Sequence, residues 1–98
     1  MASAWNVEVL AEANRNPQGI QRELGEDVYS EIMRDILALE EDPTPAEAAL
    51  LQGTKDLYRI YTYRSLYRII YQVLIRQRRV LVVRVGPRST VYSGFDRW

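Results

Sequence analysis

Hydrophobic and polar positions follow a two-residue repeat through the second half of the chain. Three runs, residues 57–63, 67–75 and 79–85, are rich in β-branched and aromatic residues, and they predict three consecutive strands. In the first run, alternation places Ile60 on one face and Arg59 and Tyr61 on the other, with Tyr58 inward and Tyr63 outward. One face of the predicted sheet therefore collects cations and aromatic rings, a composition suited to RNA.

The first half of the chain changes from a strand repeat to a helical repeat. Alternating apolar residues predict a strand over residues 4–10. A short helix is expected to follow Asn16-Pro17 and to reach residue 24, where Gly25 ends it. The strongest helical spacing covers residues 27–41. Residues 43–45, which contain two prolines, predict an extended connector.

Two connections complete the predicted order of elements. Residues 46–51 are expected to form one helical turn before Gly53, and residues 63–66 lack Gly, Asn and Asp. A loop of four or five residues is therefore expected between the first two strands of the sheet, instead of a two-residue turn.

The resulting order, β-α-α-β-β-β, predicts a small α+β fold in a single domain, residues 1–98. Two N-terminal helices are expected to pack on one face of an antiparallel-rich sheet. The first strand is expected to join the edge of the sheet beside a later strand, and the second face is expected to remain free.

Composition narrows the possible chemistry. With 98 residues the chain is long enough for one two-layer core, and it has no cysteine and no histidine. Disulfides and thiolate zinc sites are excluded, the commonest general base is missing, and neither a cofactor nor a metal is expected. No apolar run approaches the roughly 20 residues that span a bilayer, and no signal-peptide pattern is present. These features predict a soluble, cytoplasmic protein with no membrane partner.

Charge is divided between the two halves although the net charge is zero. Residues 1–50 contain three cations and eleven acids, whereas residues 51–98 contain ten cations and two acids. This division predicts a basic face for a polyanion and an acidic face that stays in solvent. Neutralisation of the two halves by each other is the simpler alternative.

The residue inventory is compatible with metal-free cleavage of RNA. In that reaction the 2′-OH attacks the adjacent phosphate, which requires a base, an acid for the leaving 5′-oxygen and cations on the phosphorane. Arginine forks suit the last role because they remain charged and match phosphate oxygens. The clustered carboxylates of a two-metal nuclease are missing from the basic half. Its candidates for proton transfer are Tyr61, Tyr63, Tyr92, Lys55, Asp56 and Asp96.

An ordered set of short motifs resembles the RelE/ParE toxin superfamily over nearly the whole chain. The motifs are Leu24-Gly25, Asp42-Pro43, Leu51-Gln52-Gly53, Asp56-Leu57-Tyr58-Arg59-Ile60, Tyr67-Arg68-Ile69-Ile70-Tyr71, Val85-Gly86-Pro87-Arg88 and Val91-Tyr92. The resemblance implies a toxin that is neutralised by a cognate antitoxin, in a toxin–antitoxin hetero-oligomer. RelE-type members are endoribonucleases that cleave mRNA in the ribosomal A site, and ParE-type members poison DNA gyrase.

The resemblance also implies roles for individual residues. Arg68 and Arg88 match arginines that act on the scissile phosphate, and Tyr92 matches a tyrosine that stacks on the mRNA base or transfers a proton. Tyr61 departs from the pattern, because RelE-type members usually have lysine or arginine there, in one case as the general base. A free phenol has a pKa of about 10 and would take this role only beside cations that lower it.

Four further cations are expected to contact RNA, either mRNA or the 16S rRNA of the ribosome. They are Arg59, which matches a cationic position of the family, together with Lys55, Arg64 and Arg84.

Three other functions remain open at this point. A ParE-type gyrase inhibitor would share the scaffold without needing Arg68, Arg88 and Tyr92. A catalytically weakened RNA-binding or ribosome-binding relative is suggested by Tyr61 and by the zero net charge. A plain protein-interaction domain is the third alternative. Among the tyrosines, Tyr58, Tyr67 and Tyr71 are expected to be core rings, because they share the inward parity of Ile60, Ile69 and Val73.

Overall fold

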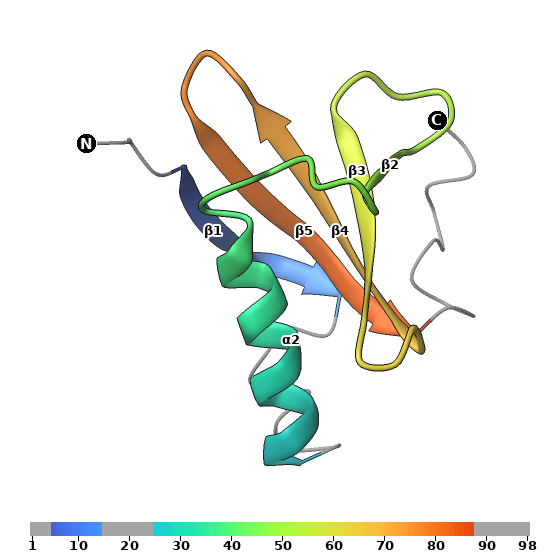
Figure 1. The fold of residues 1–98 in the computed structure, drawn as a ribbon. Coiled ribbons are helices and arrows are strands. Elements are labelled where there is room, and N and C mark those ends of the chain that lie inside the picture. Colours follow the sequence, from blue (N-terminus) through green and yellow to red (C-terminus); the bar gives the residue numbers. More distant parts are fainter. Residues whose placement is uncertain (1–4, 15–24, 88–98) are drawn as a thin grey trace.

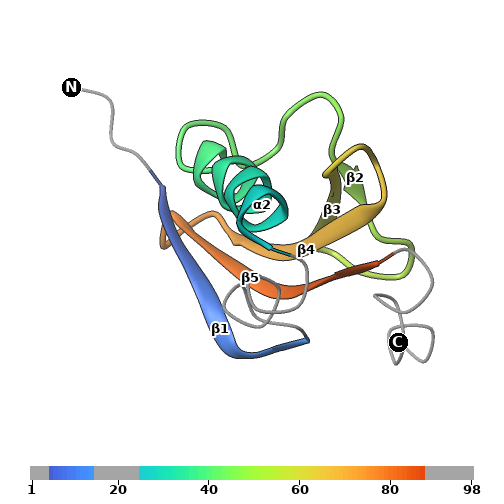
Figure 2. The same cartoon turned by 90° about the horizontal axis from the view of Figure 1, so that it is seen from below.

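The protein folds into a five-stranded sheet with a helix on one face (Figures 1 and 2). The computed structural model describes residues 5–14 and 25–87. The elements in this part are β1 (Asn6–Asn14), α2 (Glu26–Ala38), β2 (Ala49–Leu50), β3 (Leu57–Thr62), β4 (Tyr67–Leu74) and β5 (Arg79–Pro87). This confirms the predicted α+β class. Of the two expected helices only α2 is present in this part of the chain, since the one expected up to residue 24 lies outside it.

The strands have the order β1-β5-β4-β3-β2 in the sheet. The strands β2 to β5 pair antiparallel with their neighbours, and β1 pairs parallel with β5 at the edge, as expected for a strand that precedes the helix. An ion pair of 2.8 Å between Arg79 Nη2 and Glu8 Oε1 joins β5 to β1. Because β4 is the middle strand, both of its edges are paired with other strands.

The helix α2 forms because its apolar residues recur every four positions. Val28, Ile32 and Ile36 are buried on one side of the helix, and Leu39 follows as its C-cap. Acidic Glu26 and Asp27 in the first turn interact favourably with the helix dipole. The helix ends three residues earlier than the spacing predicted, and the chain then turns toward Pro43.

The core lies between α2 and one face of the sheet. Ile60, Ile69, Tyr71 and Val73 from β3 and β4 are buried there with three valines of β5, namely Val80, Val82 and Val85. Tyr58 and Tyr67 pack against this cluster, and the ring of Tyr58 stacks on that of Tyr71 with centroids 5.9 Å apart. The inward orientation predicted for Tyr58, Tyr67 and Tyr71 is therefore confirmed.

The helical turn expected over residues 46–51 is wrong. Ala49 and Leu50 form the edge strand β2, whose partners on β3 are Arg59 and Tyr58. Alanine favours a helix, but this segment is short and lies beside an unpaired strand edge, so hydrogen bonding to β3 outweighs the local preference.

The loop between β3 and β4 has four residues, as predicted, but an unexpected backbone. Thr62 and Tyr67 are the last cross-strand pair, and Leu66 N–H donates to the Tyr63 carbonyl over 3.0 Å. Tyr63, Arg64 and Ser65 adopt φ values of 48°, 57° and 65°. Side chains other than glycine rarely adopt this left-handed region. We call residues 63–65 the left-handed turn.

This turn also changes the side of the sheet on which Tyr63 lies. Strict alternation predicted Tyr63 on the same face as Arg59 and Tyr61, and this is wrong. Tyr63 packs against the core, and its ring meets that of Tyr67 edge to face at 6.2 Å. The two-residue repeat ends with β3 at Thr62, so it no longer governs the next residue.

The strand β5 contains a β-bulge. Ile70 pairs with Arg84, but its neighbour Tyr71 pairs with Val82, so Val83 is an extra residue on β5. Val80 and Val82 before the bulge face the core, and Val85 after it does so as well. The extra residue therefore turns Arg84 to the opposite face of the sheet.

Within the described residues, no helix is long and apolar enough to cross a membrane.

Tyr71 ties the core to the loop after α2. The Tyr71 hydroxyl donates a buried hydrogen bond of 2.7 Å to the Pro43 carbonyl oxygen. Burial raises the pKa of Tyr71 above its ordinary value, and the charges of Tyr58, Asp42 and Glu47 add to the effect. A raised pKa favours the neutral phenol in the folded protein. Its contribution to stability is therefore complete below about pH 10, the pKa of an unfolded tyrosine, and is lost at higher pH.

We expect Tyr71→Phe to lower the free energy of unfolding by about 1–3 kcal/mol near neutral pH, because the Pro43 carbonyl loses its donor. Above about pH 10 the difference between wild type and variant should shrink. Urea denaturation at the two pH values measures both effects. Tyr29→Phe on α2 is the control for loss of a phenol. A difference that stays constant with pH would contradict the assignment.

We expect Ser65→Gly to raise the free energy of unfolding by up to about 1 kcal/mol, because glycine adopts a positive φ without steric cost. Leu66→Gly is the matched control, since Leu66 is exposed and lies outside the left-handed turn; it should destabilise the protein. Thermal denaturation of both variants gives the sign, and a Ser65→Gly variant less stable than wild type would refute strain in this turn.

Candidate functional site

Two guanidinium groups lie over the ring of Tyr61, on the face of the sheet opposite α2. Tyr61 and Arg68 are cross-strand partners, and Arg59 precedes Tyr61 by two residues on β3. The Cζ atom of Arg68 lies 4.0 Å from the ring centroid of Tyr61, and that of Arg59 lies 4.6 Å from it. Both distances are within the range of cation–π attraction. We call these three residues the arginine–tyrosine cluster.

Arg68 is almost completely buried, with an exposed fraction of 6%, whereas Tyr61 is 44% exposed. The Nη1 atom of Arg68 donates a hydrogen bond of 2.9 Å to the carbonyl oxygen of Ser65. The left-handed turn is thus attached to the cluster through a backbone group. Within the described residues Ser65 takes one of the five N–H donors that a guanidinium carries.

The cluster lacks a carboxylate counterion among residues 5–14 and 25–87. Arg34 and Arg79 form ion pairs with carboxylates in this part of the chain, whereas no such pair involves Arg59 or Arg68 there. A buried arginine is normally paired with an acid. Here the ring of Tyr61 and the Ser65 carbonyl stand beside Arg68 instead. Arg59 and Arg68 together therefore form a local positive charge suited to an anion.

Arg84 extends this positive face across β4 to β5. Arg59 pairs with Ile70, and Ile70 pairs with Arg84, so the three residues form one row across the sheet. Two interstrand spacings separate Arg59 from Arg84, about 10 Å between their Cα atoms. The β-bulge at Val83 places Arg84 on this face. The sequence predicted that Arg84 contacts RNA.

The other expected cations lie apart from the cluster. Arg64 is exposed in the left-handed turn, with its Cζ 5.6 Å from the ring centroid of Tyr63. Lys55 is exposed before the start of β3, whereas Tyr61 is near the end of that strand. About 20 Å of extended chain separates Lys55 from Tyr61. Arg88 and Tyr92, both expected at the catalytic site, lie outside the described residues.

Two other candidates for proton transfer point away from the cluster. The carboxylate of Asp56 accepts a hydrogen bond of 3.0 Å from Gln72 Nε2, near the start of β3. Tyr63 packs on the core side of the sheet. Among the described candidates, Tyr61 alone lies beside Arg68. The last candidate, Asp96, lies outside the described residues.

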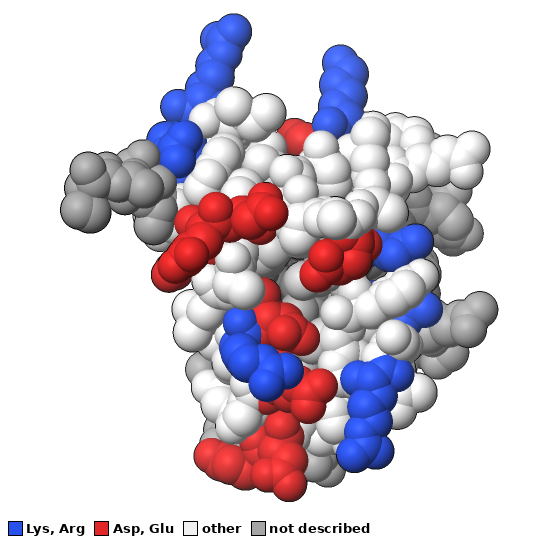
Figure 3. Space-filling model, in the orientation of Figure 1, with Lys and Arg blue, Asp and Glu red and all other residues white. Residues whose placement is uncertain are grey.

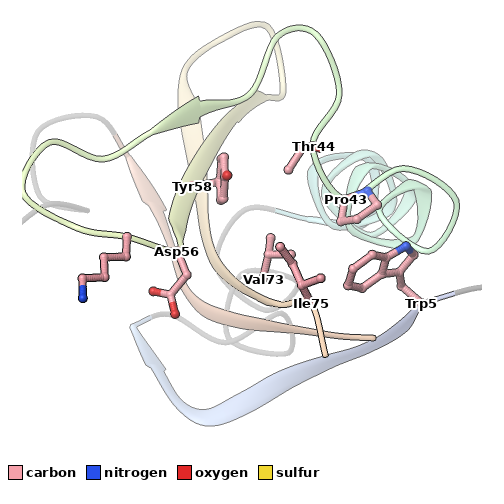
Figure 4. Close-up of a pocket in the computed structure, with 8 residues that line it drawn as sticks. Trp5, Pro43, Thr44, Asp56, Tyr58, Val73 and Ile75 are labelled. Carbon is pink, nitrogen blue, oxygen red and sulfur yellow. The ribbon is translucent and has the colours of Figure 1, made fainter. Parts of the chain in front are cut away.

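Figure 4 shows an apolar cavity of about 200 Å³ at the same end of the sheet as Lys55. Trp5 and Pro43 border it on the side of α2, and Val73 and Ile75 lie at its centre. Asp56 and Lys55 give it one polar end. It is separate from the arginine–tyrosine cluster, because none of the three residues of that cluster lines it.

A second cavity, of about 220 Å³, runs between α2 and β3 and has an acidic lining. Its residues are Asp35, Ala38, Leu39, Asp42, Pro45, Glu47, Ile60 and Tyr61. Asp35 also accepts a hydrogen bond of 2.6 Å from the hydroxyl of buried Thr62. No group of three or more acids in the described residues is arranged to hold a metal ion. Tyr61 therefore lies at the border of this cavity as well as in the arginine–tyrosine cluster.

Acidic side chains gather along α2 and the loop that follows it, as Figure 3 shows. The arginine–tyrosine cluster lies on the other face of the sheet. The charge division seen in the sequence thus becomes a division in space, with Glu26 and Asp27 of α2 exposed and Glu31 and Asp35 half-buried.

Sequence reasoning placed Arg59 and Tyr61 on one face of the sheet and expected Arg68 and Tyr61 in one catalytic site, but it did not predict that both guanidinium groups contact the Tyr61 ring. The signal was present in the arginine–x–tyrosine spacing of β3, which puts Arg59 and Tyr61 on one face. A known hairpin register would have placed Arg68 opposite Tyr61. The contact of Arg68 with Ser65 was missed, because a backbone carbonyl has no signature in the sequence.

Comparison with known proteins identifies the family. The model of the family "ParE toxin of type II toxin-antitoxin system, parDE" matches residues 7–92. The mRNA interferase toxin RelE of Escherichia coli strain K12 is 38% identical over 74 residues, which cover 74% of this chain and 77% of that protein.

Solved structures agree with this result. A free-state mutant of E. coli toxin RelE superposes with a TM-score of 0.71 at 28% identity, covering 96% of this chain and 97% of that one. The toxin in the intact E. coli RelBE toxin–antitoxin complex gives a TM-score of 0.67 at 30% identity, covering 86% and 96%. The chain therefore belongs to the RelE/ParE superfamily of toxins of type II toxin–antitoxin systems.

Proposed function

We propose that this protein cleaves mRNA on the ribosome, as the toxin of a type II toxin–antitoxin pair. The observation that carries the proposal is the arginine–tyrosine cluster, in which Arg59 and Arg68 have no described carboxylate partner. Two relatives of this chain, from E. coli and Shigella flexneri, are named as RelE mRNA interferases. A phosphodiester is the anion that such a protein would place against these guanidinium groups.

The reaction needs no metal. The 2′-OH loses its proton and attacks the adjacent phosphorus, while the bond from phosphorus to the 5′-oxygen breaks and that oxygen takes up a proton. Arg68 and Arg88 would stabilise the charge on the phosphorane, since guanidinium forks pair with two oxygens at once. Tyr92 would stack on the base or transfer a proton. The products are a 2′,3′-cyclic phosphate and a free 5′-OH.

The burial of Arg68 suggests an order of contacts. A phosphate approaching this face meets Tyr61 and Arg59 first, because they are more exposed than Arg68. Arg68 then contributes its charge from a site where little water screens it, which strengthens its interaction with an anion. Its Nη1 would keep the hydrogen bond to the Ser65 carbonyl, and the other N–H groups of the guanidinium would pair with the phosphate oxygens.

The charge distribution supports one orientation on the ribosome. The acidic face over α2 repels RNA, and the opposite face carries Arg59, Arg68 and Arg84. Arg64, exposed in the left-handed turn, would contact the flanking backbone of mRNA or of 16S rRNA. Lys55 would make a separate phosphate contact at the far end of β3. Association should weaken as salt rises, as for other contacts with phosphates.

A cognate antitoxin is the second proposed partner. The solved relatives include RelE in complex with RelB from E. coli and an archaeal RelE–RelB complex from Pyrococcus horikoshii OT3. An extended or helical antitoxin segment that covers the basic face would block RNA and hold the toxin in an inactive hetero-oligomer.

DNA gyrase is the alternative target. The matching family model is named for ParE toxins, so gyrase inhibition is tested beside RNA cleavage.

We expect the protein to cut an mRNA only when ribosomes are present, and Arg68→Ala to lower the cutting rate by about 10²-fold or more, the usual effect of losing one donor to a developing charge. Primer extension on the mRNA locates and quantifies the cuts. Arg68→Lys keeps the charge but loses the fork, and it should be impaired as well.

Arg34→Ala is the matched control. Arg34 is an exposed cation of the acidic face with two ion pairs to acids of α2, and its loss should leave cutting unchanged. Melting temperatures of all variants show whether each is folded. Cuts without ribosomes, or equal rates in wild type and a folded Arg68→Ala, would contradict the proposal. Double-strand breaks with purified gyrase would assign the protein to the ParE type.

A further inference from the structure

We propose that Tyr61 is a positioning residue that acts through the face of its ring, holding Arg59 and Arg68 together to receive one phosphodiester anion. Its hydroxyl then has no part in proton transfer. This inference rests on the proposed function for its substrate, but the anion site that it describes can be tested without cleavage.

The Tyr61 ring contacts both arginines of the cluster. The Cζ atoms of Arg59 and Arg68 lie over one ring, at 4.6 Å and 4.0 Å from its centroid. The two guanidinium ions carry like charges and repel each other, and no described carboxylate is paired with either of them. The negative face of an aromatic ring attracts both. Tyr61 therefore offsets the repulsion through the face of its ring, and within the described residues Ser65 takes one of the five N–H donors of Arg68.

The neighbouring contacts fix Arg68 from a second direction. Its Nη1 donates to the Ser65 carbonyl at 2.9 Å, and its Cζ lies over the Tyr61 ring at 4.0 Å from the centroid. A buried long side chain with both contacts has lost most of its rotamer freedom before a ligand arrives. Pre-ordering of this kind lowers the entropic cost of binding an anion.

The contacts that define this role belong to the ring and not to the hydroxyl. A phenylalanine at the position would keep both cation–π contacts, whereas a leucine would keep apolar bulk and lose them. A general base shows the opposite dependence, because removing the hydroxyl removes the proton acceptor. The two roles therefore predict different behaviour for Tyr61→Phe. Under the positioning role, the proton acceptor of the cleavage reaction is another group.

The first test measures binding of a 2′-O-methyl RNA trinucleotide, which has no 2′-OH to attack its own phosphates. The probe is titrated into the full-length protein while the side-chain Nε–Hε resonances of Arg59 and Arg68 are followed by NMR. We expect both resonances to shift in wild type and in Tyr61→Phe with the same dissociation constant within about twofold. Tyr61→Leu should bind about tenfold more weakly, as expected for loss of cation–π contacts to both arginines.

Tyr63→Leu is the matched control. Tyr63 is in the same hairpin and has Arg64 over its ring at 5.6 Å, but it packs on the other side of the sheet. Its loss should leave binding of the probe at the wild-type value, with melting temperatures confirming that each variant is folded. Wild-type resonances of Arg59 and Arg68 that do not respond to the probe would overturn the inference, as would equal binding by wild type and folded Tyr61→Leu.

Ribosome-dependent cleavage provides the second test. Tyr61→Phe should retain the wild-type rate within about threefold and the same dependence on pH, whereas a lost general base would cost about 10²–10⁴-fold. A loss of that size, with probe binding intact, would show that the hydroxyl is the base and overturn the inference. If wild type cuts nothing, the proposed function fails, and the titration still decides whether Tyr61 positions the arginines.

Discussion

The alternation of side chains along β4 is the constraint on which the rest of the molecule depends. Ile69, Tyr71 and Val73 point toward α2 and are buried, so their neighbours must point to the other face. Arg68 is one of these neighbours. A slip of one residue in the hairpin would exchange Arg68 with Ile69 and place a guanidinium in the apolar core, at a cost of several kcal/mol (on the order expected for an unpaired buried charge). Packing under the helix thus fixes the position of the cations.

The sheet also keeps opposite charges apart. Acids of α2 stay on one side, and Arg59 and Arg68 stay on the other, with a layer of apolar side chains between them. A protein that neutralised these arginines with its own carboxylates would gain little stability, because a buried ion pair barely compensates for lost hydration. Without such carboxylates the arginines can pair with a phosphate instead.

Sequence reasoning succeeded where one local pattern decides the structure. The spacing of Val28, Ile32 and Ile36 predicted α2, and alternation predicted the three long strands and the inward tyrosines. It failed where pairing with a distant segment decides, as for β2 at Ala49 and Leu50. The left-handed φ values at the β3–β4 turn had no signal either, since none of its residues is glycine, asparagine or aspartate.

For the candidate site, residue types were predictable and their contacts were not. Tyr61 was recognised as a departure from the family pattern, but its place beside both arginines follows from the hairpin register, which the residues of the turn did not specify. The burial of Arg68 has the same origin. It depends on which segments pack around the start of β4, and neighbouring residues in the chain carry no information on it.

The β-bulge at Val83 shifts the two-residue repeat of β5 by one position. Up to Val82 the even-numbered valines face the core, and after the bulge Val85 faces it instead. A single inserted residue therefore decides which face of the sheet each later side chain of the strand points to. A homologue that lost or gained one residue here would keep its composition and its overall strands, yet it would exchange valine for arginine on both faces beyond that point. Length variation in β5 is therefore more damaging than most substitutions, and gaps in alignments of this family should avoid this strand.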